Sequence, residues 1–239
     1  MNKIKQFLIT TIAIVCLSTS AFAGSFGIGV SGTAASVSAS GTETTGAQTA
    51  GTAQTDNSVV RATAGNRIMF GSVFAEYNFL DSERFTLGID YIPGEADVNK
   101  ETLSRTDTNS DGTENNLQAG TRKANAKISD HVTYYGELVL GAGIYGKVGF
   151  AQVDIKTTES TATTVAATTG SYPNKTLDAW TYGIGQKGNL GKNGFYKVEG
   201  FITDYDTFSA TSTGGVGNAN TVSADLDVVG ASLKIGLKF

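Results

Sequence analysis

The sequence predicts an all-β fold, an eight-stranded antiparallel transmembrane up-and-down β-barrel, on the basis of three observations. The last eleven residues, Val229–Phe239, carry an apolar residue at every odd position and Gly, Ser or Lys at every even one. A strict period of two predicts a strand with one apolar and one polar face. Seven earlier segments alternate in a similar way, and the connections between segments alternate between long and short. An even number of such strands is typical of membrane barrels.

The first 23 residues have the pattern of a secretory signal peptide. Lys3 and Lys5 give a positive start, an apolar stretch follows, and Ala21-Phe22-Ala23 is a small-residue cleavage motif. Cleavage between Ala23 and Gly24 would leave residues 24–239 as one barrel domain. It would also remove the chain's only cysteine.

The first four predicted strands place their large apolar residues on one face. Their ranges are 25–38, 66–79, 84–92 and 128–140. The residues expected to point outward are Phe26, Ile28, Val30, Ala34, Met69, Val73, Ala75, Tyr77, Phe79, Phe85, Leu87, Ile89, Tyr91, Val132, Tyr134, Leu138 and Leu140. An outward apolar face and an inward polar face suit a barrel in lipid.

The last four predicted strands follow the same rule. Their ranges are 144–155, 177–187, 195–205 and 223–239. The phase of 144–155 is less regular, and Val148 and Phe150 are its expected outward pair. In the next two strands the outward residues are Trp180, Tyr182, Ile184, Tyr196, Val198 and Ile202.

Four long inserts follow the odd-numbered strands, at 39–65, 93–127, 156–176 and 206–222. Short turns follow the second, fourth and sixth strands. This asymmetry predicts long extracellular loops and short periplasmic turns. Both prolines, Pro93 and Pro173, fall in the long inserts, where they interrupt no strand pairing.

The inward face carries charged residues that we expect to fill the lumen as a paired network. They are Glu76, Asp90, Glu137, Lys147, Lys197, Glu199 and Lys234. The interior of an eight-stranded barrel is just wide enough for side chains to fill. Pairing about Ala142 would set Glu137 opposite Lys147. Pairing about Gly191 would set glycines opposite Lys197 and Glu199, giving them room.

The C-terminus resembles that of small bacterial outer-membrane barrels of the OmpA and opacity-protein (surface antigen) type. The resemblance rests on the terminal Phe239 and the alternating apolar residues before it. It implies a cell outer membrane location and membrane lipid as a partner. It also implies that the assembly machinery reads Phe239 as its signal, and that the outer loops meet an extracellular ligand of unknown identity.

Composition limits the other partners. The formal net charge of −4 argues against nucleic acid. No cofactor is predicted, and three G-x-G-x-x-G matches lack the strand–helix context of a nucleotide site. Asp107–Asp111 resembles the start of an EF-hand loop, but its twelfth position is Gln118, so no metal site is predicted and calcium binding there stays open.

An enzyme is not predicted. His131 is the only histidine, and Ser129 would share its inward face. However, residues two apart on a strand are about 7 Å apart at the backbone, too far for a nucleophile–base pair. The predicted function is therefore structural or surface-interacting, through the long extracellular loops. The alternative is a small passive pore, porin-like, for ions or small solutes.

Overall fold

The structure is a computed structural model that describes residues 24–44, 59–79, 84–97, 103–107, 120–162, 172–211 and 221–239. Ten strands make up almost all of this. They are β1 (Gly24–Thr44), β2 (Val59–Phe79), β3 (Phe85–Asp97), β4 (Leu103–Asp107), β5 (Gly120–Gly141), β6 (Ile144–Ala162), β7 (Lys175–Leu190), β8 (Gly194–Tyr205), β9 (Phe208–Thr211) and β10 (Thr221–Lys238). Within these ranges no helix is long and apolar enough to cross a membrane.

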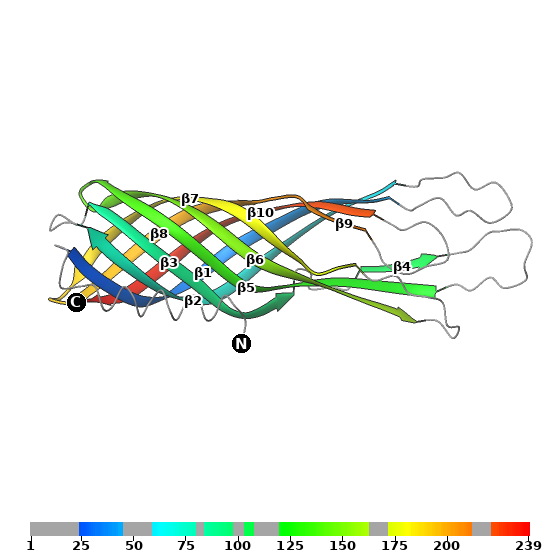
Figure 1. The fold of residues 1–239 in the computed structure, drawn as a ribbon, viewed down its shortest axis with the longest axis horizontal. Helices are drawn as coiled ribbons and strands as arrows, with labels where there is room; N and C mark the ends of the chain where they lie inside the picture. The colour runs from blue at the N-terminus through cyan, green and yellow to red at the C-terminus, as the bar shows by residue number, and fades with distance from the viewer. Residues whose placement is uncertain are drawn as a thin grey trace, which may run out of the picture.

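Eight of the ten strands close into a barrel (Figure 1). Neighbours pair antiparallel in the order β1-β2-β3-β5-β6-β7-β8-β10, and β10 pairs back onto β1. The short β4 and β9 pair only with β5 and β10, and they continue the positions of β3 and β8. The predicted fold class is confirmed, with the predicted strand number, antiparallel order and closure.

The β5–β6 and β7–β8 hairpins, the paired ends of β2 and β3, and the C-terminus lie at one end of the barrel, which we call the turn end (Figure 1). Two of the predicted hairpin registers are confirmed, because Glu137 lies opposite Lys147 and Phe79 lies opposite Phe85 in the strand register. The third is wrong by two residues. Gly185 pairs with Glu199, and Lys187 pairs with Lys197. The turn is centred on Lys192, since Gly191, with φ of 70°, begins a three-residue connection from Leu190 to Gly194.

The strands run further than the sequence predicts at the opposite end, which we call the extended end. β1 and β2 stay paired as far as Thr44 and Val59, and β5 and β6 pair as far as Thr121 and Ala162. These parts of the chain are rich in Thr, Ser, Ala and Lys, so they lack the strong apolar alternation used to find strands. A strand surrounded by water can be polar on its outer face, so it lacks the large outward apolar residues by which the membrane strands were predicted.

A belt of exposed apolar side chains surrounds the barrel, starting at the turn end and continuing toward the extended end. It includes Ile28, Val30, Met69, Val73, Phe85, Leu87, Leu138, Leu140, Ile144, Val148, Trp180, Tyr182, Ile184, Val198, Ile202, Val229, Leu233, Ile235, Leu237 and Phe239. On β10 the belt runs from Val229 to Phe239. Ten residue steps of ~3.3 Å at a tilt of about 40° span about 25 Å, the height of an apolar band in a membrane barrel. Beyond the belt the outward positions become acidic, at Asp154, Asp178, Asp204 and Asp227.

The interior has two different fillings. Behind the belt it holds buried charged and polar residues, including Glu76, Glu137, Lys197, Glu199 and Lys234. In the extended half it holds two adjoining apolar clusters, which we call the extended core. These are Val153, Ile155, Leu177, Phe208 and Ala210, and Ala35, Val37, Leu226 and Val228. The lumen is therefore filled by side chains at both levels.

A β-bulge in β5 separates these two levels. Asp130 has a φ of 52°, and the pairing with β6 shifts between Ser129 and Val132. Beyond the bulge Ile128 packs against the extended core. The bulge therefore breaks the parity that placed Ser129 and His131 on one face, and that prediction is wrong.

Candidate functional site

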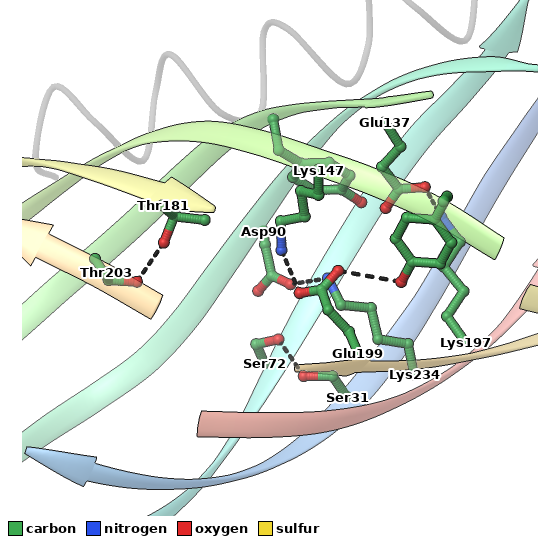
Figure 2. Close-up of polar contacts among 12 residues, drawn as sticks. Ser31, Ser72, Asp90, Glu137, Lys147, Thr181, Lys197, Glu199, Thr203 and Lys234 are labelled. Atoms are coloured by element: carbon green, nitrogen blue, oxygen red, sulfur yellow. Dashed lines mark hydrogen bonds and ion pairs between the residues drawn. The ribbon is translucent and has the colours of Figure 1, made fainter. Parts of the chain in front are cut away.

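The seven predicted lumen residues lie on six strands around the inside of the barrel. Glu76 is on β2, Asp90 on β3, Glu137 on β5 and Lys147 on β6, while Lys197 and Glu199 are on β8 and Lys234 is on β10. Figure 2 labels six of them, Asp90, Glu137, Lys147, Lys197, Glu199 and Lys234, and shows their side chains gathered inside the barrel. We call this set the charge cluster. Strand alternation places them inside, since each is flanked by residues that face outward.

Lys197 is shared by two carboxylates. Its Nζ lies 2.5 Å from Oε2 of Glu76 and 2.7 Å from Oε2 of Glu137. All three side chains are at most 3% exposed. Tyr135 also donates its hydroxyl to Glu76, at 3.2 Å. Oε1 of Glu137 has no hydrogen-bond partner among the described residues. This group therefore carries two carboxylates on one ammonium.

Glu199 and Lys147 form the second group. Their nearest atoms, Lys147 Nζ and Glu199 Oε1, are 2.6 Å apart. The second carboxylate oxygen of Glu199 accepts the hydroxyl of Tyr145 at 3.1 Å. Both oxygens of this buried carboxylate are therefore satisfied, as burial of a charge requires.

Lys234 and Asp90 form the third group, with 2.9 Å between Nζ and Oδ2. The Tyr135 ring joins this group to the second, because Lys234 Nζ lies 4.9 Å and Lys147 Nζ lies 5.0 Å from its centroid. These distances are within the range of cation–π attraction. The cluster thus contains four carboxylates and three ammonium groups in three ion-paired groups, which Tyr135 links through its hydroxyl and its ring.

The expected partnership of Glu137 with Lys147 is not formed, although the two residues face each other in the register of β5 and β6. Each pairs with β8 instead, Glu137 with Lys197 and Lys147 with Glu199. In a narrow closed barrel, long side chains reach across the lumen, so cross-strand register does not decide which charges meet.

The glycines of the lumen make room for tyrosines. A Cβ on Gly88 would lie 2.2 Å from the Tyr135 ring, and one on Gly185 would lie 2.6 Å from the Tyr145 ring. The predicted interior gives this space to charged residues and includes neither tyrosine. Their inward positions on β5 and β6 could have been found from the same alternation.

His131 lies between the charge cluster and the extended core. Its Nε2 is 2.8 Å from the Tyr205 hydroxyl, and its Nδ1 has no partner within the described part of the chain. Ser129 pairs with Glu95 and Asp154, beyond the bulge. The extended core was not predicted from the sequence. The less regular phase of 144–155 was the available sign, because Val153 and Ile155 are apolar and point inward.

The structure describes only part of the other predicted sites. Phe239 is exposed at the turn end, and its backbone exchanges hydrogen bonds with Phe26. Gly24 begins β1, while Ala23 and the rest of residues 1–23 lie outside the described residues. Asp107 ends β4, and 108–111 also lie outside them. Within the described ranges, no group of three or more His, Cys, Asp or Glu residues is placed to hold a metal ion.

Charges on the outer surface of the extended end pair differently. Glu95 contacts Lys156 at 2.6 Å and Lys127 at 3.5 Å, and all three are exposed to solvent. The hydrogen bond and charge of Lys156 lower the pKa of the Glu95 carboxyl. The same contact raises the pKa of Lys156. Exposed pairs of this kind contribute little to stability.

Solved structures show a similar barrel architecture at low sequence identity. The outer membrane protein OprG of Pseudomonas aeruginosa is 13% identical, with 91% of this chain and 97% of that chain covered and a TM-score of 0.43. Ail, the attachment invasion locus protein of Yersinia pestis, is 13% identical, with 91% and 100% covered and a TM-score of 0.39. The outer membrane protease OmpT of Escherichia coli is 11% identical, with 93% and 100% covered and a TM-score of 0.42.

No family model and no curated protein match the sequence. The identities and TM-scores of the solved structures are too low to transfer an activity, and they do not place the chain in the OmpA or opacity-protein family. The eight-stranded fold rests on the strand register of this chain.

Proposed function

We propose that this chain is an integral outer-membrane barrel with a sealed lumen, and that it works as a structural or surface-interaction protein through its extended end. The observation that carries the proposal is the inversion around the barrel wall. Large apolar side chains are exposed outside, while lysines and glutamates are buried inside. In water the exposed apolar face would be costly, whereas in lipid it is favourable, and a polar interior behind an apolar outer face is typical of membrane barrels.

The filled lumen favours this role over a passive pore. Lys197, Glu137 and Glu199 are each 1% exposed, and their ion pairs cross the interior. The extended core adds an apolar barrier further along the same axis. An ion would have to break buried pairs and then cross an apolar layer, and both steps are unfavourable.

An enzymatic role has less support. The chain's only histidine bonds to Tyr205, and the pairing register separates it from Ser129. Partners in this proposal are membrane lipid at the belt, the outer-membrane assembly machinery and an extracellular ligand at the extended end. No nucleic acid or cofactor has a role in it.

Conductance of the refolded protein in a planar bilayer tests the sealed lumen. We expect a silent membrane, with β-rich circular dichroism and a mobility shift on boiling to show that the barrel has folded. Steady and uniform openings would contradict the proposal and favour the pore. Lys197→Met is the matched positive control, because it removes the ammonium group that joins two walls of the lumen.

Cysteine labelling in intact cells tests the orientation. Cys16 is the only cysteine and lies within the predicted signal peptide. Lys156→Cys would place a thiol on the extended end, and Lys192→Cys would place one on a hairpin of the turn end. We expect a membrane-impermeant maleimide to label the first in intact cells and the second only after lysis. The reverse result would contradict the proposed orientation.

Deletion of Phe239 tests the proposed assembly signal. Phe239 is exposed at the rim and packs little, so its loss should reduce the yield in cells much more than refolding in detergent. Leu237→Ala, on the same face of β10, is the matched control for loss of apolar area. Equal yields of the deletion variant and the wild type in cells would remove this part of the proposal.

A further inference from the structure

The belt has a groove on its outer surface, over β3, β5, β6 and β7. Its volume is about 380 Å³, near the lower end of the range for ligand pockets. Leu87 and Val148 flank Gly136 in the paired register, and Tyr134, Phe150 and Trp180 form the next row along the barrel. The lining is almost wholly apolar. The groove exists because Gly136 has no side chain where its neighbours do.

The aromatic row gives the groove a rigid edge. The rings of Phe150 and Trp180 pack edge-to-face, with 5.7 Å between centroids. The floor is thin, since Gly136, Gly88 and Gly149 all contribute backbone. The interior behind the floor is closed by the buried Tyr135 ring, which lies over Gly88. The groove therefore opens only toward the surroundings of the belt.

We infer that this groove holds one acyl chain of a membrane lipid. The inference rests on the proposed function, because it requires the belt to face lipid. The groove is continuous with the rest of the belt and offers almost no polar group to a ligand. A flexible hydrocarbon chain fits such a site, since contact with bare backbone and fixed rings adds dispersion attraction that a gap would lose.

Gly136 allows the groove to be filled without strain. A Cβ there would lie 3.7 Å from Leu87 Cδ2, an ordinary contact distance. Gly136→Leu should therefore fill the groove, and Gly136→Ala should fill it in part. Gly200→Leu is the matched control. Gly200 lies on the belt face of β8, where a Cβ would meet nothing within 4 Å, and it is not part of the groove.

The test uses phosphatidylcholine vesicles in which some lipids carry a photoreactive group midway along one acyl chain. After photolysis, the labelled positions on the refolded mature chain are mapped. We expect labelling at Tyr134, Phe150 and Trp180 to exceed the belt average about fivefold, the ratio that ~1 kcal/mol gives, which is the cost of a methyl-sized void. Gly136→Leu should remove the excess, Gly136→Ala should halve it, and Gly200→Leu should leave it unchanged.

Trp180 supplies a second measurement because it is the only tryptophan of the chain. Lipids with brominated acyl chains quench tryptophan on contact, so we expect stronger quenching in the wild type than in Gly136→Leu at equal lipid composition. Equal quenching in both would contradict the inference. Each variant is first checked for the mobility shift on boiling, and Gly136→Ala carries the test if Gly136→Leu does not fold.

The outcomes separate the inference from the proposed function. Even labelling over the whole belt would overturn the groove and leave the lipid-facing belt intact. Absence of labelling from the belt would overturn both. Displacement of the excess label by an equal concentration of free fatty acid would identify a free fatty acid as the occupant. Protein–protein crosslinks through the groove would identify a second copy of the chain. Either of these last two results would overturn the lipid assignment.

Discussion

The two halves of the barrel use the same sequence pattern in opposite senses. Leu233-Lys234-Ile235 in the belt and Val153-Asp154-Ile155 in the extended half both read apolar–charged–apolar. In the first, the lysine is buried and its neighbours are about half exposed. In the second, both apolar residues are buried, with Val153 fully so, while the aspartate is on the outside. The same three-residue pattern thus turns inside out between the two halves.

The change of surroundings explains this inversion. Strand alternation continues along each wall, so the inward row passes from lysine and glutamate to valine, isoleucine and leucine without a change of face, except at the Asp130 bulge. In the proposed membrane the outer face must be apolar, and polar residues can be placed only inside. Beyond it the outer face meets water, and the strands bury apolar residues as any soluble barrel does.

Loss of Lys197 should have the largest effect. Lys197→Met leaves Glu76 and Glu137 buried together without their shared cation, and we expect a loss of at least about 3–5 kcal/mol. Urea unfolding in micelles measures it. Lys156→Met, in the exposed pair with Glu95, is the matched control and should change stability much less. A similar loss in both variants would show that the charge cluster is not the special feature of the belt half.

The triple variant with Lys197→Met, Glu76→Gln and Glu137→Gln sharpens this result. Since no buried charge is then left unpaired, much of the lost stability should return. If it does not, the loss in the single variant comes from packing of the lysine stem.

Truncation in the extended core should have a somewhat smaller and more local effect. Leu177 is 2% exposed, and Leu177→Ala should cost about 2–4 kcal/mol through lost contacts and a cavity. Hydrogen exchange should increase in the extended parts of β6, β7 and β9 and stay unchanged around the charge cluster. Ile184→Ala, on the belt face of the same strand, is the control. Uniform exchange changes would mean that the two halves unfold as one unit.

Removal of one tyrosine hydroxyl should have a moderate effect. Tyr145→Phe deletes the donor to Glu199 but leaves Lys147 in place. A hydrogen bond to a charged group contributes about 1.5–3 kcal/mol, and this is the loss that we expect in urea unfolding. Tyr182→Phe, on the outer face of β7, should cost much less. Comparable losses would indicate that the charge cluster does not depend on its tyrosines.

The exposed pair should show the smallest effect, as a pH dependence. The pKa of Glu95 is lowered from 4.5, so its contribution is complete above pH 4.5 and disappears as the pH falls through the lowered pKa. The pKa of Lys156 is raised from 10.5, so its contribution disappears as the pH rises through the raised pKa. The Tm difference between wild type and Lys156→Met should therefore be confined to the range between these two values. Added salt should reduce it, and a difference that does not shrink as the pH is lowered from 4.5 would contradict the pairing.

Much of the barrel could be predicted from local pattern. The alternation in 223–239 gave the closing strand with its faces correctly assigned, because a period of two needs only the order of the residues. The short turns at Gly141–Gly143 likewise gave the register of Glu137 with Lys147. All seven residues of the charge cluster were placed on the inward face by the same alternation.

Contacts across the barrel could not be predicted in this way. Lys197 meets Glu76 and Glu137, which are 121 and 60 residues away, only when the sheet closes and its curvature sets which walls face each other. The extended core, the pairing of β4 and β9, and the Asp130 bulge depend on neighbours contributed by distant strands. Alternation along one strand tells which side each residue takes, but closure of the whole sheet decides what it meets there.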